Sequence, residues 1–107
     1  MKVEAFHNFE VLESLSHIKQ VLEQVKSEVA QKYHVRTLGL FGSVVRNDFS
    51  ADSDIDILVD FIQPIGIEFI DLAELIEKRL MRRIDLVSKN GIKEKYFKAI
   101  EKEIIYV

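Results

Sequence analysis

Short apolar segments alternate with longer stretches of helical period along this chain, and that alternation limits the folds it can adopt. Residues 8–33 carry apolar side chains at steps of three and four, separated by Glu, Lys and Gln, as one face of an amphipathic helix does. Short apolar runs typical of strands occupy residues 35–41, 55–61 and 84–87. The alternation predicts an α/β or α+β fold with a small mixed β-sheet and helices packed on one face.

Turn residues set the remaining boundaries. The Gln-Pro-Ile-Gly tract at residues 63–66 breaks the chain after the second strand, because Pro lacks an amide donor and Gly tolerates positive φ. Further elements are predicted as a helix at 67–81, a turn at Asn90-Gly91, a last helix at about 92–102 and a terminal strand at 104–107. We expect residues 1–107 to form a single domain, since the chain shows no internal repeat and has 107 residues.

Composition argues against several kinds of site. Fifteen Lys and Arg against eighteen Asp and Glu give a net charge of −3, whereas a nucleic-acid scaffold needs clustered positive charge. The chain has no cysteine, which excludes disulfides and thiolate metal sites. No apolar run approaches the ~18 residues of a membrane span, and no apolar signal core follows the first residues. We therefore expect a cytoplasmic protein without a membrane partner.

Two aspartates lie two residues apart at the start of the second predicted strand. Asp54 and Asp56 point the same way, because side chains alternate between the faces of a strand. Asp85 lies in the third strand between Ile84 and Leu86, which point to the opposite face. If the third strand pairs beside the second, Asp85 joins the other two carboxylates. Three hard oxygen donors on one patch suit Mg²⁺, which shares its ligand shell with phosphates.

Gly42-Ser43 follows the first strand and offers groups suited to a phosphate. Gly has no Cβ, so the backbone can approach a phosphate closely, and Ser43 is predicted to cap a short helical turn. Its hydroxyl and the amides at the helix start can then donate hydrogen bonds to phosphate oxygens. Arg46 lies one helical turn further and can neutralise charge on a triphosphate. A phosphate cradle beside a carboxylate triad indicates phosphoryl or nucleotidyl transfer.

The spacing of these residues carries a family resemblance. Gly42-Ser43, ten intervening residues and then Asp54-x-Asp56 resemble the signature of the polymerase-β nucleotidyltransferase superfamily. The flanks resemble its minimal nucleotidyltransferase (MNT) branch, and they read Leu40-Phe41-Gly42-Ser43-x-x-Arg46 and Ser53-Asp54-Ile55-Asp56-Ile57-Leu58-Val59. The resemblance implies a polymerase-β-like core, with Mg²⁺ on Asp54, Asp56 and Asp85 and the triphosphate on Gly42 and Ser43.

The same resemblance implies a function and a partner. Small members of this branch are often the antitoxins of HEPN-domain ribonuclease toxins. The chain is thus expected to transfer AMP from ATP, with two Mg²⁺ ions, to a tyrosine hydroxyl of a cognate HEPN toxin, and to form a hetero-oligomer with it. Two alternatives stay open: an antitoxin that inhibits its toxin by binding alone, and a nucleotidyltransferase acting on RNA or a small molecule. The acidic balance counts against RNA.

Two of the candidate residues also have purely structural alternatives. Asp85 can instead be a surface carboxylate in an ion pair with Arg82 or Arg83. Arg46 can be a solvated helix residue or a partner of Asp48, and the sequence does not favour either reading over a phosphate contact.

Overall fold

Four strands form one mixed sheet in the order β3-β2-β1-β4. The computed structural model describes residues 15–46, 48–50 and 52–107. The strands are β1 (Val35–Phe41), β2 (Ile55–Phe61), β3 (Ile84–Ser88) and β4 (Ile105–Tyr106). β2 and β3 run parallel, whereas β1 is antiparallel to both of its neighbours. The first two strands have the bounds that their apolar runs predict, and the other two differ from prediction by one or two residues.

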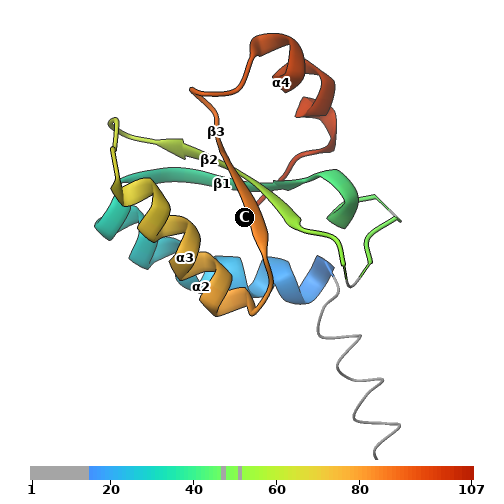
Figure 1. Cartoon of the computed structure of the whole chain (residues 1–107), viewed down its shortest axis with the longest axis horizontal. Coiled ribbons are helices and arrows are strands. Elements are labelled where there is room, and N and C mark those ends of the chain that lie inside the picture. Colours follow the sequence, from blue (N-terminus) through green and yellow to red (C-terminus); the bar gives the residue numbers. More distant parts are fainter. Residues whose placement is uncertain (1–14, 47, 51) are drawn as a thin grey trace, which may run out of the picture.

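Helices cover the sheet unequally. They are α2 (Leu15–Tyr33), α3 (Glu68–Leu80) and α4 (Glu94–Ile100), with 3-10 turns η1 (Gly42–Val44) and η2 (Glu101–Glu103). α2 and α3 lie together on one side of the strands, and α4 lies beyond the other side (Figure 1). The predicted fold class is confirmed, except that the predicted last helix, α4, packs on the face opposite α2 and α3. The part of the first predicted helix before residue 15 lies outside the described residues.

The apolar stripe of α2 forms the largest side of the core. Ile18, Leu22, Val25 and Val29 are each at most 2% exposed and recur at steps of three and four. They pack against the strands and α3, and burial of each such side chain contributes about 1.5–3 kcal/mol. His34 adopts φ 60° directly after the helix, which turns the chain into β1. No helix in the described ranges is long and apolar enough to cross a membrane.

Alternation along β2 divides its side chains between two apolar clusters. Ile57 and Val59 point into the main core with α2 and α3, whereas Leu58 packs with Phe41 and Ile100 in a smaller cluster on the other face. Even-numbered positions of β2 therefore share the face on which α4 packs. This assignment decides where the carboxylates of the second strand project.

β4 pairs with β1 and forms the edge of the sheet opposite β3. Gly39 pairs with Tyr106 and Leu40 pairs with Ile105 between β1 and β4. The amide of Val107 donates to the carbonyl of Leu38 at 3.0 Å. A Cβ on Gly39 would lie 2.6 Å from Cγ2 of Ile104 and 3.2 Å from the Tyr106 ring, so the missing side chain lets this segment approach β1.

We predict that Gly39→Ala lowers the free energy of unfolding by about 1–3 kcal/mol, because the new methyl group overlaps the branched side chain of Ile104. Urea unfolding measures this difference. Gly91→Ala is the matched control, since a Cβ there would meet only Ser88 at 3.7 Å or beyond. Equal stability of the two variants would contradict the close approach of the C-terminal segment.

Candidate active site

Two of the predicted carboxylates face each other across neighbouring parallel strands. Asp56 of β2 is the register partner of Asp85 of β3, so both side chains project from the same face of the sheet. Asp54 directly precedes β2 and falls on that face by alternation. The condition set by the sequence, that the third strand pairs beside the second, is met. All three carboxylates belong to the face opposite α2 and α3.

The negative charges of Asp54 and Asp85 lie close enough to Asp56 to affect its pKa. Burial of this half-buried side chain raises its pKa above the ordinary value of 3.8, and the negative charges of Asp85 and then Asp54 raise it further. The Arg46 guanidinium acts in the opposite direction. Repulsion among hard oxygen donors is the condition that a divalent cation relieves, so the donor set suits Mg²⁺. In the described part of the chain, however, no three acidic or histidine side chains already converge as a metal-binding group.

Gly42 brings the end of β1 against this cluster. Its φ is +76°, a conformation that residues with a side chain rarely adopt, and a Cβ there would collide with the Asp56 carboxylate. The amides of Val45 and Arg46 donate to the Gly42 carbonyl at 3.1 and 3.3 Å, which closes the turn of η1. The prediction that Ser43 caps this turn is wrong. Ser43 lies inside η1, and Phe41 occupies the capping position without a side-chain bond.

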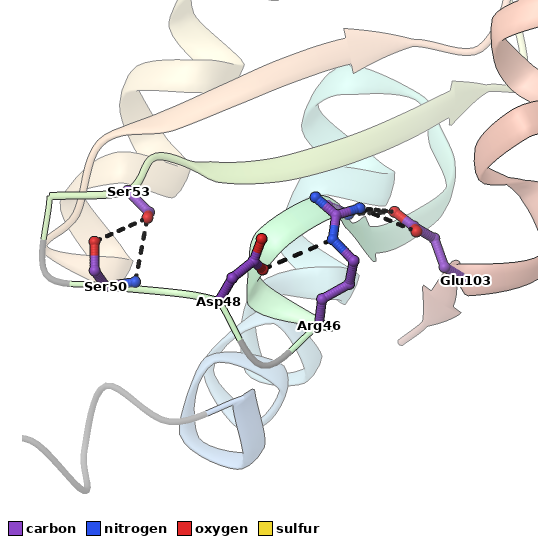
Figure 2. A network of polar contacts seen from close by, with 6 residues as sticks. Arg46, Asp48, Ser50, Ser53 and Glu103 are labelled. Carbon is purple, nitrogen blue, oxygen red and sulfur yellow. Dashed lines mark hydrogen bonds and ion pairs between the residues drawn. The ribbon is translucent and has the colours of Figure 1, made fainter.

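A carboxylate that the sequence did not single out lies against the predicted phosphate cradle. The amide of Gly42 donates to Oε2 of Glu103 at 2.7 Å, and Nη1 of Arg46 lies 3.2 and 3.3 Å from the two carboxylate oxygens. Arg46 also places its Nε 3.7 Å from Asp48 (Figure 2). The ion-pair alternative for Arg46 is thus realised, with Glu103 as a second partner. Glu103 stands 61 residues from Gly42 in an acid- and lysine-rich segment, where no local pattern marks it.

Arg82 holds the loop that leads into Asp54. Its Nη2 donates to the carbonyls of Ser50 and Ser53 at 3.2 and 2.7 Å, and its guanidinium lies 4.8 Å from the Phe49 ring centroid. The same two serines bond to each other through their hydroxyls at 3.1 Å (Figure 2). Sequence reasoning missed this role, because carbonyl contacts across 29 and 32 residues leave no spacing pattern.

Arg83 pairs with Asp54, the first aspartate of the motif. Its Nε lies 3.5 Å from Oδ1 of Asp54, and both side chains are largely accessible to solvent. Of the two partners that the sequence offers for Asp85, Arg83 thus has Asp54 as an ion-pair partner among the described residues. A cavity of about 370 Å³ opens beside this pair, and it is lined by Asp52, Ser53, Asp54, Met81, Arg82 and Arg83.

Comparison with known proteins identifies the class. The chain matches the model of the nucleotidyltransferase domain family over residues 18–107, which include every candidate site residue. The chain belongs to this family and is a nucleotidyltransferase, as its Gly-Ser and Asp-x-Asp residues indicate.

Individual relatives cover nearly the whole chain. The protein adenylyltransferase MntA of Thermococcus cleftensis is 41% identical over 95 residues, 88% of this chain and 96% of the relative. A candidate protein adenylyltransferase of Methanocaldococcus jannaschii is 39% identical over 98 residues, 90% of this chain and 100% of the relative. These similarities confirm the resemblance to the minimal nucleotidyltransferase branch.

Solved structures agree with the fold. A candidate minimal nucleotidyltransferase superposes with a TM-score of 0.75 at 29% identity, over 86% of this chain and 94% of that one. The toxin–antitoxin structure MntA–HpeT contains a chain with a TM-score of 0.64 and 17% identity, covering 83% of this chain and 70% of that one. At that identity the second likeness concerns the fold alone.

We predict that Asp56→Asn raises the free energy of unfolding at pH 7 in the absence of divalent cations. Because the folded pKa of Asp56 lies above its unfolded value, ionisation of this carboxylate destabilises the fold as pH rises through that window. The advantage of the variant should shrink as pH falls below about 3, because the aspartate is then protonated in both the folded and the unfolded state. Urea unfolding at both pH values measures it, with the exposed helix variant Glu23→Gln as control. A variant less stable than the parent at pH 7 would contradict the repulsion.

We also predict that Arg82→Ala loosens the loop before Asp54. Loss of two carbonyl contacts and the Phe49 stacking should speed amide hydrogen exchange at residues 48–50 and 52–54 by about tenfold, while the strands keep their protection. Arg79→Ala is the control, because Arg79 binds Glu28 of α2. Unchanged hydrogen exchange in this loop would contradict a role for Arg82 in positioning Asp54.

Proposed function

We propose that this chain is an AMP-transferring antitoxin, a Mg²⁺-dependent enzyme that moves AMP from ATP to a tyrosine hydroxyl of a cognate HEPN-domain ribonuclease toxin. The observation that carries the proposal is the pairing of Asp56 with Asp85 beside the positive-φ Gly42. It joins a cluster of hard oxygen donors to a backbone turn that can approach a phosphate. The 41% identity to a protein adenylyltransferase named MntA supports protein as the acceptor class.

The three carboxylates would bind the metal ions, and one of them would also accept the proton of the attacking hydroxyl. Asp54, Asp56 and Asp85 would hold Mg²⁺, and two bound ions would neutralise triphosphate charge and lower the pKa of the attacking hydroxyl. Asp85 is the more exposed of the register pair, so it is placed to take the proton of the incoming hydroxyl. The tyrosine oxygen then bonds to the α-phosphorus, the bond from that phosphorus to the β-bridging oxygen breaks, and pyrophosphate leaves.

The turn after β1 is assigned to the triphosphate. The Gly42 amide, the Ser43 hydroxyl and the Arg46 guanidinium would bind its oxygens, while the missing Cβ of Gly42 keeps the turn close to Asp56. Catalysis in such a site comes mainly from positioning and charge neutralisation. The acceptor would enter beside Asp54, where the cavity lined by the loop and Arg83 opens. The toxin itself would complete the acceptor site in a hetero-oligomer.

We predict that Asp54→Ala combined with Asp56→Ala abolishes transfer, lowering its rate at least about 100-fold, because the metal-binding charges are removed. The assay uses α-labelled ATP, Mg²⁺ and the cognate HEPN toxin. Asp71→Ala is the matched control, since Asp71 is an exposed aspartate of α3 outside the triad and the cavity. Label transfer by the double variant at the parent's rate would sink the assignment.

One observation favours the second candidate function, an antitoxin that acts by binding alone. Arg83 forms an ion pair with Asp54, so one carboxylate of the triad already has a partner within the chain. Co-expression with the toxin separates the two functions. If the double variant still protects cells fully, inhibition is by binding; if protection is lost while the complex still forms, inhibition is by AMP transfer. Labelling of RNA ends by the purified chain would favour the RNA-directed alternative.

A further inference from the structure

Glu103 is bound by two of the groups that the proposed function assigns to the triphosphate. The Gly42 amide donates to its carboxylate at 2.7 Å, and Arg46 approaches both carboxylate oxygens at 3.2 and 3.3 Å. Figure 2 shows the carboxylate facing the end of the guanidinium. Both contacts are charge-assisted, and they select an anion in this position. The cradle thus already binds an anion supplied by the chain itself.

The main chain around Glu103 keeps this anion in reach of the cradle. Ile100, which directly precedes η2, is 8% exposed and packs against Phe41 at the end of β1. β4 begins two residues after Glu103 and pairs with β1. The Glu103 side chain itself is 26% exposed, so solvent screens it only in part. A tethered carboxylate of this kind acts at a high effective concentration against any free ligand.

We propose that Glu103 competes with the triphosphate for Gly42 and Arg46, and so determines the nucleotide affinity of the site. This inference rests on the proposed function in taking those two groups as triphosphate ligands. Triphosphate oxygens displace the carboxylate from both donors, and the carboxylate returns when the ligand leaves. A carboxylate that holds the cradle about nine-tenths of the time lowers the apparent affinity about tenfold.

The alternative role for Glu103 is to position Arg46. In that case the carboxylate stays in place when nucleotide binds, and its charge helps to orient the guanidinium toward the ligand. The two roles predict opposite effects of removing the charge. Competition predicts tighter anion binding without it, whereas positioning predicts equal or weaker binding.

Titration calorimetry with inorganic tripolyphosphate in the presence of Mg²⁺ tests the inference directly. Glu103→Gln keeps the size of the side chain but removes its charge, so it should bind tripolyphosphate about tenfold more tightly than the parent. Glu101→Gln is the matched control, because Glu101 is an exposed acid of the same 3-10 turn. Thermal melting confirms that both variants are folded. Adding Arg46→Ala to Glu103→Gln should erase most of the gain, since Arg46 is one of the released donors.

Each outcome separates this inference from the proposed function. Tighter tripolyphosphate binding by Glu103→Gln, without AMP transfer in any variant, supports competition while the proposed function fails. AMP transfer with equal or weaker binding by Glu103→Gln overturns competition and leaves the proposed function standing. Failure of the parent and of Glu103→Gln to bind either tripolyphosphate or ATP overturns the inference.

Discussion

The parallel register between β2 and β3 is the constraint on which the site depends. It places Asp56 opposite Asp85, so the fold holds two like charges side by side on one face. Burial further disfavours the ionised form of Asp56, so burial and the neighbouring negative charges together raise its pKa. The sheet tolerates it because Ile57 and Val59, on the other face, anchor β2 in the main core. Apolar burial on one side of a strand thus stabilises a charge arrangement on the other side that alone would oppose folding.

Positively polarised groups lie next to these carboxylates, in the turn that follows β1. Positive character at the cradle comes from a backbone amide and one guanidinium, and Gly42 brings the amide against Asp56 because it has no side chain. An unliganded cluster of donors of this kind attracts whatever anion is near. Glu103 supplies that anion from η2, and β4 keeps the segment on the sheet edge. The C-terminal strand therefore has a part in the chemistry of the site as well as in the stability of the fold.

Local pattern predicts most of the fold and the position of the motif aspartates on one face of the sheet. β1 is predicted by an apolar run that ends before Gly42, and β2 by one that begins after polar loop residues. The motif aspartates are predicted to share a face because side chains alternate along a strand. Glu103 and Arg82 escaped prediction because their contacts join residues far apart in sequence through side chain and backbone. Ser43 was misassigned because a short turn needs no side-chain cap when backbone bonds to the Gly42 carbonyl close it. Hydrophobic periodicity marks elements, whereas single polar contacts between elements leave no period.

Two charged groups of the candidate site form ion pairs within the chain while they remain partly exposed to solvent. Asp54 pairs with Arg83 and is exposed at 47% of its side-chain surface. Glu103 and Arg46 neutralise each other in the same manner at the cradle. Asp56 and Asp85 lie side by side with like charge, whereas Asp54 and Arg46 thus each have an internal partner of opposite sign. Such pairs are weak at the surface, so a ligand with several charges can replace them together where a single ion cannot. Binding then exchanges these internal pairs for contacts with the ligand.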